Sequence, residues 1–148
     1  MPDQSAAGYA GDISPSEAYS ILEKDESAVL VDVRTKAEWA YVGAPDLAAL
    51  GKKTLFIEWQ EFPSMTVNSN FAAKLEAALR EKGAGRDAPV LFLCRSGARS
   101  RAAAIAMTAA GHTQCFNIAD GFEGPLDEQR HRGATAGWKA QGLPWSQS

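Results

Sequence analysis

Apolar residues recur along this chain with two different periods, and the alternation of these periods predicts the fold class. Short runs that are apolar at most positions predict strands at residues 28–33, 54–59, 89–94 and 114–119. Segments with apolar residues three or four apart predict helices between these runs. Strands that alternate with helices indicate an α/β protein, with a mostly parallel sheet and helices on both of its faces.

Helix boundaries are marked by capping signals. Residues 14–17 ("SPSE") and 35–38 ("TKAE") each read as a capping box at the start of a helix. A longer helix is predicted from a cap at Asn68 to about Lys82, and another helix over residues 99–110. The buried stripe of the longer helix consists of Phe71, Leu75 and Leu79. A last helical turn is predicted in "WKAQGLPW" near the end of the chain.

Composition narrows the class of protein. The chain has 148 residues, of which 45% are hydrophobic and 22% charged, as is typical of one globular domain. A net charge of −3 gives no basic excess and argues against a nucleic-acid partner. Residues 1–12 are small and polar and are expected to form a flexible tail before a single domain at 13–148. They lack the features of a secretion signal and no apolar run suits a membrane, so a cytoplasmic protein is expected.

The two cysteines, Cys94 and Cys115, are too few for a disulfide framework in a chain of this size. The sequence has no cluster of cysteine and histidine at zinc-binding spacing, and His112 and His131 stand apart. We therefore expect no metal site.

The segment "CRSGARS" carries the candidate chemistry. Cys94 ends an apolar strand, and a helix follows whose first N–H groups have no partners within the helix. Gly97 can adopt a positive φ, which lets the turn curl into a ring of N–H groups that stabilises an anion. Arg95 and Arg99 add positive charge. A thiol in such surroundings is favoured as a thiolate, which makes Cys94 a candidate nucleophile.

Two reactions use a cysteine within an anion cradle: hydrolysis of phosphate esters and transfer of sulfane sulfur. Cysteine phosphatases have an arginine six positions after the cysteine, where this chain has Ser100. Arg99 and Arg101 flank that position, and the shorter C-x4-R spacing to Arg99 indicates a smaller ring that suits sulfur better than phosphate. A phosphatase or arsenate reductase remains an alternative.

"CRSGARS" resembles the active-site loop of the rhodanese-like sulfurtransferases. Three other segments resemble further parts of that family in the same order, namely "VLVDVRTKAEW" (29–39), "FNIADGFEG" (116–124) and "GWKAQGLPW" (137–145). The resemblance implies a rhodanese-like three-layer α/β fold around a central five-stranded, mostly parallel sheet. A non-catalytic or regulatory binding module with this fold is an alternative, although such modules usually lack the cysteine.

The resemblance also implies the parts of the site. Cys94 would be the catalytic residue that carries a persulfide. The substrate-binding residues would be those of the cradle, namely Arg95, Ser96, Gly97, Ala98 and Arg99. A small anionic sulfur donor such as thiosulfate and a thiol or cyanide acceptor are implied, with no metal and no organic cofactor.

Several residues keep two interpretations. Asp32 and Arg34 could pair and brace the loops or take part directly, and Glu38 reads as a helix cap. Cys115 would need to lie close to Cys94 to act as a resolving thiol. Trp59 and Phe62 could wall the pocket.

The chain departs from the family pattern in two places. "VGAPDL" (42–47) lacks the histidine common in the family, and "PLDEQRHRGATA" (125–136) is an insertion with His131 and Arg132. The insertion could border the pocket or form a solvated surface loop.

Overall fold

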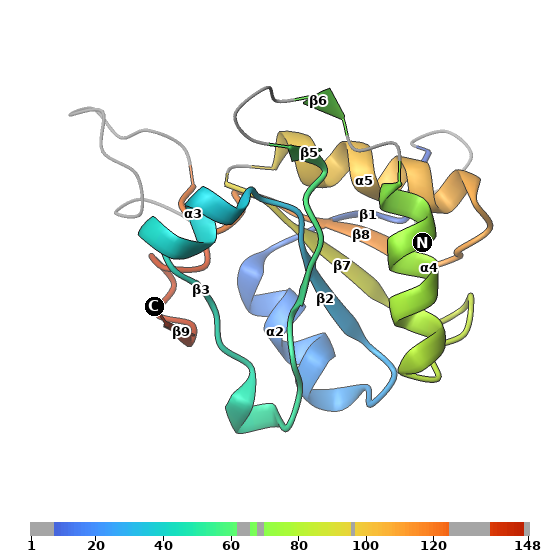
Figure 1. Ribbon diagram of the computed structural model, residues 1–148. Helices are drawn as coiled ribbons and strands as arrows, with labels where there is room; N and C mark the ends of the chain where they lie inside the picture. Colours follow the sequence, from blue (N-terminus) through green and yellow to red (C-terminus); the bar gives the residue numbers. More distant parts are fainter. Residues whose placement is uncertain (1–7, 62–65, 68–69, 96, 125–136, 147–148) are drawn as a thin grey trace.

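The computed structural model of the chain describes residues 8–61, 66–67, 70–95, 97–124 and 137–146. A central sheet is formed by five strands, in the order β1 (Gly11–Ile13), β8 (Cys115–Ile118), β7 (Val90–Leu93), β2 (Val29–Asp32) and β4 (Leu55–Phe56). Every neighbouring pair in this sheet is parallel. Figure 1 shows α2 (Pro15–Lys24) on one side of the sheet and α4 (Phe71–Glu81) and α5 (Ala98–Ala109) on the other. The predicted three-layer α/β fold is confirmed.

The two middle strands β2 and β7 are buried at every position, because helices cover both of their faces. Their side chains divide the core into two clusters. One cluster lies under α4 and α5 and includes the predicted stripe of Phe71, Leu75 and Leu79. The other cluster lies under α2 and contains the fully buried Trp138.

Both predicted capping boxes form. At α2 the Ser14 hydroxyl accepts from the Glu17 N–H at 3.1 Å, and the Glu17 carboxylate accepts from the Ser14 N–H. Thr35 and Glu38 make the same reciprocal pair at α3 (Lys36–Tyr41). Helix α4 begins at Phe71 with Asn70 as its N-cap, and the predicted cap Asn68 lies outside the described residues.

The predicted tail is too long. Gly11 and Asp12 belong to the edge strand β1, which pairs with β8, and Tyr9 is buried. Strand β1 was missed because it has three residues and only Ile13 among them is apolar. A parallel neighbour holds this short edge in place, since Ala10 also donates its N–H to the Cys115 carbonyl at 2.9 Å.

The predicted last helical turn is present. The Gln141 N–H donates to the Gly137 carbonyl, and the chain then passes into β9 (Trp145–Ser146). Strand β9 pairs antiparallel with β3 (Ala44–Pro45), away from the main sheet. A second small pair joins β5 (Gln60–Glu61) and β6 (Thr66–Val67), and a short 3₁₀ helix, η1 (Ala48–Leu50), follows β3.

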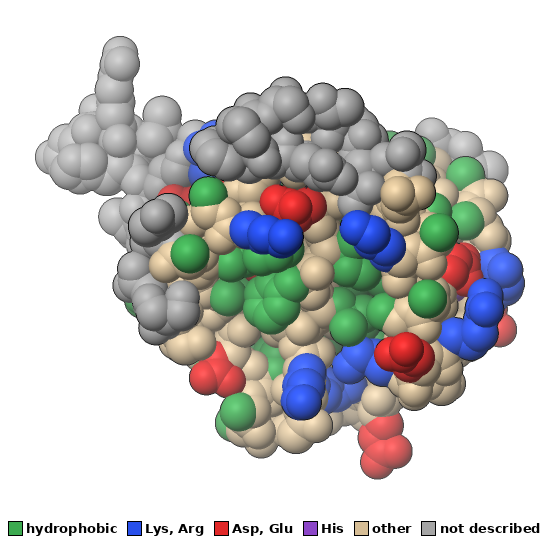
Figure 2. Space-filling view, in the orientation of Figure 1, with side chains coloured by type: hydrophobic (Ala, Val, Ile, Leu, Met, Phe, Trp, Pro, Cys, Tyr) green, Lys and Arg blue, Asp and Glu red, His purple; other side chains and the backbone are tan. Residues whose placement is uncertain are grey.

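The surface includes a patch of apolar side chains, seen near the centre of the face in Figure 2. Phe56, on the edge strand β4, is 45% exposed and packs edge to face against Trp39. Among the described helices, none has the length and apolar character needed to cross a lipid bilayer.

Candidate active site

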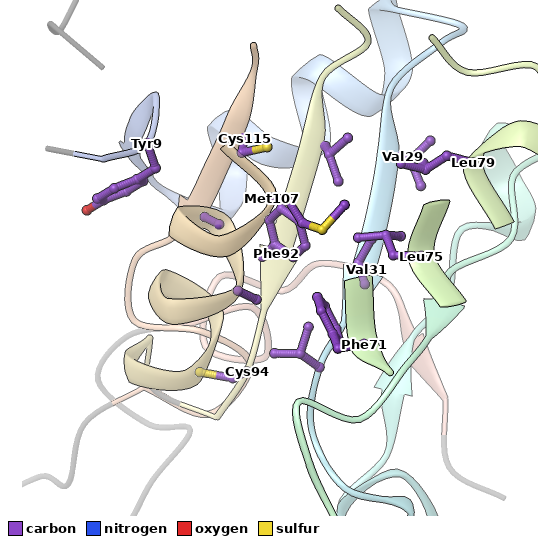
Figure 3. Close-up of a cluster of buried hydrophobic side chains, with 14 residues drawn as sticks. Tyr9, Val29, Val31, Phe71, Leu75, Leu79, Phe92, Cys94, Met107 and Cys115 are labelled. Atoms are coloured by element: carbon purple, nitrogen blue, oxygen red, sulfur yellow. The ribbon is translucent and has the colours of Figure 1, made fainter. Parts of the chain in front are cut away.

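The candidate site lies where β7 ends and α5 begins. Strand β7 stops at Leu93, Cys94 follows, and α5 starts at Ala98. Figure 3 shows the Cys94 side chain beside the first turn of α5, at the edge of an apolar cluster. The Cys94 side chain is almost fully buried, with 1% of the residue exposed. The carboxyl ends of parallel strands are where ligands bind in open α/β sheets, so the thiol is placed where chemistry is expected.

The Cys94 sulfur accepts two hydrogen bonds from the start of α5. The Gly97 N–H donates to it at 3.1 Å and the Ser100 hydroxyl lies 3.2 Å from it. The unpaired N–H groups and the dipole at a helix start also favour negative charge nearby. This arrangement favours negative charge on the Cys94 sulfur.

The turn between Cys94 and α5 depends on a glycine. Gly97 has φ +118°, a left-handed conformation that other residues rarely adopt, as the sequence predicts. Of the other predicted cradle residues, Arg95 and Ala98 are exposed, and Ala98 opens α5. Ser96 lies outside the described residues.

Arg99 is bound to Glu38 of α3. The two side chains form a bidentate ion pair, with Nη1–Oε1 at 2.7 Å and Nη2–Oε2 at 2.9 Å. Burial alone would raise the pKa of Glu38, but the Arg99 guanidinium outweighs burial and the pKa is lowered overall. Glu38 therefore caps α3, as predicted, and also ties this helix to the start of α5.

A buried ion pair braces the end of β2. Arg34 donates from Nε to Asp32 Oδ1 at 2.9 Å and from Nη2 to Oδ2 at 2.7 Å, and both side chains are fully buried. The same Nη2 donates to the Gly43 carbonyl at 2.8 Å, and the guanidinium lies 4.3 Å from the centre of the Phe122 ring. These contacts agree with the predicted bracing role, since they join β2 to the segments around Gly43 and Phe122.

A tight turn after β8 supports the Cys94 loop. The Phe122 N–H donates to the Cys94 carbonyl at 2.8 Å, and the Glu123 N–H donates to the Arg95 carbonyl at 3.0 Å. Gly121 has φ +61°, and a Cβ at this position would lie 2.6 Å from the Arg95 carbonyl oxygen. Only glycine lets the two backbones approach this closely. The sequence contains this glycine, but it does not reveal that the Arg95 backbone lies against it.

Two polar residues behind Cys94 were missed as site residues. Ser100 and Asn117 are both buried, and their side chains are hydrogen-bonded to each other. Asn117 lies within the otherwise apolar strand β8. A buried asparagine within an apolar strand needs partners, and this signal could have drawn attention to it.

Cys115 does not lie near Cys94. It is the register partner of Val90, which is four residues before Cys94 on the neighbouring strand. Four residues of strand span about 13 Å, well beyond the reach of a disulfide. Both cysteines are free, and burial raises the pKa of Cys115 to about 11. A resolving role for Cys115 is therefore contradicted.

The other residues singled out in the sequence lie against the core or outside the described residues. Trp59 is partly buried and packs edge to face on Phe71, against the apolar cluster under α4 and α5. Phe62, His131, Arg132 and the whole 125–136 insertion lie outside the described residues. Within the described ranges, no three His, Cys, Asp or Glu side chains are grouped so that they could hold a metal ion.

Residues 10–148 match the family described as the STR4 middle domain. The crystal structure of Rv0390 from M. tuberculosis is 51% identical in sequence and has a TM-score of 0.84, covering 95% of this chain and 99% of that one. An uncharacterized RP600 homolog from Rickettsia rickettsii is 39% identical, over 90% of this chain and 94% of its own length. The chloroplastic rhodanese-like domain-containing protein 4 of Arabidopsis thaliana is 27% identical over 89% of this chain and 25% of its own length.

Proposed function

The chain belongs to the STR4 middle domain family and is a rhodanese-like domain, and from this premise we propose that it is a sulfurtransferase that carries sulfane sulfur on Cys94. One observation carries the proposal. A buried thiol sits at a helix start and accepts hydrogen bonds from the Gly97 N–H and the Ser100 hydroxyl. A buried cysteine that only fills space has no need of donors directed at its sulfur.

The first half of the reaction loads the cysteine. The Cys94 thiolate attacks the outer sulfur of a donor such as thiosulfate. A new sulfur–sulfur bond forms to Cys94 while the bond within thiosulfate breaks, and the electron pair of the broken bond leaves with sulfite. Cys94 then holds a persulfide whose negative charge is on the outer sulfur.

The second half returns the enzyme to its starting form. A nucleophile such as cyanide or a thiolate attacks the outer sulfur and forms a bond to it. The bond between the two sulfurs breaks, and its electron pair returns to Cys94 as a thiolate. Thiocyanate or a new persulfide leaves. This two-step exchange requires ping-pong kinetics.

The loop from Arg95 to Arg99, Ser96 included, would bind the donor. Arg95 is exposed beside the thiol and would attract an anion. Gly97 and Ala98 offer backbone N–H groups at the helix start. Arg99 is already paired with Glu38, so a donor would meet a guanidinium whose charge is partly balanced. The small cradle suits a compact sulfur anion better than a bulky phosphate ester.

The test is the mass of the intact protein after treatment with thiosulfate or another sulfane donor. We expect wild-type protein to gain the mass of one sulfur atom and to lose it when cyanide is added, with release of thiocyanate. Cys94→Ala should gain nothing, and Cys115→Ala should behave as wild type. A folded wild-type protein that gains no sulfur from any donor would overturn the proposal, and so would Cys94-dependent hydrolysis of a phosphate ester without sulfur loading.

A further inference from the structure

The Ser100 hydroxyl has more acceptors around it than protons to donate. Its oxygen lies 3.2 Å from the Cys94 sulfur and 3.1 Å from the Gly97 carbonyl oxygen. It also makes a short hydrogen bond to Asn117 Oδ1. A serine hydroxyl carries a single proton, so it can serve only one of these acceptors well at a time. Ser100 is fully buried, which makes an unmet acceptor at this place costly.

Asn117 is held so that its oxygen faces Ser100. Strands β1 and β8 are in register with Asp12 beside Asn117, and Asn117 Nδ2 donates to Asp12 Oδ1 at 2.9 Å. A carboxylate only accepts hydrogen bonds, so the NH₂ group must face Asp12 and the oxygen must face Ser100. The Tyr9 hydroxyl donates to the same carboxylate at 2.8 Å, and Arg101 lies 3.7 Å from its second oxygen.

The number of donors and acceptors then depends on the state of Cys94. In the thiol form, the S–H can donate to the Ser100 oxygen while Ser100 donates to Asn117, and each group has a partner. Once the proton has left to solvent, the thiolate keeps the Gly97 N–H as one donor, but its second donor is the single proton on Ser100, which must serve either sulfur or Asn117. The thiolate form is therefore one donor short.

We propose that Ser100 is a positioning residue for Cys94, and that Asn117 competes with the Cys94 sulfur for its single proton. The sulfur-transfer role of this competition rests on the function proposed above. Loading moves the negative charge from the Cys94 sulfur to the outer sulfur of the persulfide, so Ser100 can turn back to Asn117. Each acceptor of the network then has a donor in the thiol and persulfide forms, and only in the bare thiolate is one acceptor left without a donor. This destabilises the thiolate relative to the persulfide and favours loading of Cys94 with sulfur.

The competition predicts opposite effects from two neighbouring substitutions. Ser100→Ala removes the donor, and Asn117→Leu removes the competing acceptor while keeping a side chain of similar size. We would measure alkylation of Cys94 by iodoacetamide against pH, in sulfur-free protein, with Cys94→Ala as background. Ser100→Ala should slow alkylation at neutral pH about tenfold and move the midpoint of the profile up, since a hydrogen bond to a charged group is worth about one decade. Asn117→Leu should speed it severalfold and move the midpoint down.

Two further variants keep the test decisive if Asn117→Leu does not fold. Asp12→Asn, on a side chain that is 42% exposed, frees the Asn117 amide to turn and should act in the same direction with a smaller effect. Ser100→Thr keeps the hydroxyl and should restore a profile close to wild type. The proposal would be overturned if Ser100→Ala and Asn117→Leu changed the alkylation rate in the same direction, or if neither variant moved the midpoint of the pH profile. Because no sulfur donor is used, these results are independent of whether the protein transfers sulfur.

Discussion

Cys94 and Cys115 are two buried cysteines in one apolar cluster, yet their surroundings differ in kind. The sulfur of Cys94 accepts hydrogen bonds from the Gly97 N–H and the Ser100 hydroxyl. The thiol of Cys115 lies 3.9 Å from the His112 carbonyl, to which it can only donate. Burial raises the pKa of Cys115 to about 11, which keeps it a thiol at physiological pH. The two cysteines therefore differ in the donors directed at the sulfur and not in burial.

The same contrast extends to the two ends of the sheet. Among the described residues, six polar side chains are buried, and five of them gather around the Cys94 end: Asp32, Arg34, Thr35, Ser100 and Asn117. Only His112 belongs to the Cys115 end. Buried polar groups are tolerated when they are paired, so their concentration at one end marks where the fold maintains a polar site.

The largest expected effect on stability comes from the buried ion pair between Asp32 and Arg34, near the Cys94 end of the sheet. Asp32→Asn should lower the free energy of unfolding by about 3–5 kcal/mol, because it leaves the buried Arg34 guanidinium without its counter-charge. Urea unfolding measures this change. The control is Arg101→Gln, which breaks a long, exposed ion pair with Asp12 and should cost less than about 1 kcal/mol. Equal losses in the two variants would show that the buried ion pair contributes no more to stability than the exposed one.

Gly121→Ala should have the next largest effect. An alanine there has a strained positive φ and a Cβ too close to the Arg95 carbonyl, which together should cost about 3 kcal/mol in urea unfolding. Gly83→Ala is the matched control, because Gly83 has φ +72° but nothing within 4 Å of the added carbon. That variant should lose only about 1 kcal/mol. A similar loss in both would mean that the turn does not support the Cys94 loop.

Much of the Cys94 end could be predicted from the sequence because its signals are local. The strand that stops at Cys94, the glycine with positive φ at 97 and the capping box at Thr35 each involve residues a few positions apart. The expectation of an anion cradle follows from these signals once the helix start is recognised.

The missed features join residues far apart along the chain. The Arg99–Glu38 pair spans 61 positions and the Asn117–Asp12 bond spans 105. Both depend on which strands and helices are neighbours, and strand order is not encoded in any one segment. Strand β1 illustrates this, since its place beside β8 is what brings Asp12 to Asn117.

Cys115→Ala sharpens the comparison at the other end of the sheet. Replacing a fully buried thiol by a methyl group leaves a small cavity and should cost about 1 kcal/mol of stability. Sulfur loading of Cys94 should not change, because Cys115 is on the far side of the core. Loss of loading in a variant that is still folded would contradict the separation of the two cysteines.

The smallest effect is expected for Glu38→Gln. Glutamine can keep the capping box at Thr35 but loses the ion pair with Arg99, so the cost near neutral pH should be below about 1 kcal/mol. The folded-state pKa of Glu38 is lowered from its ordinary 4.5, so the pair stabilises the protein above pH 4.5 and this contribution is lost as the pH falls through the folded value. Unfolding of both proteins across this range should show the stability difference shrinking in acid. A difference that stays constant would mean that the pair contributes little.

The central claim is that the two cysteines differ in chemistry although both are buried, and locating the transferred sulfur tests it most directly. Wild-type protein would be treated with thiosulfate, digested under non-reducing conditions, and the peptides weighed. We predict the mass of one added sulfur atom on the peptide that contains Cys94 and none on the peptide that contains Cys115. Sulfur on Cys115, or on neither peptide with any sulfane donor, would contradict the account.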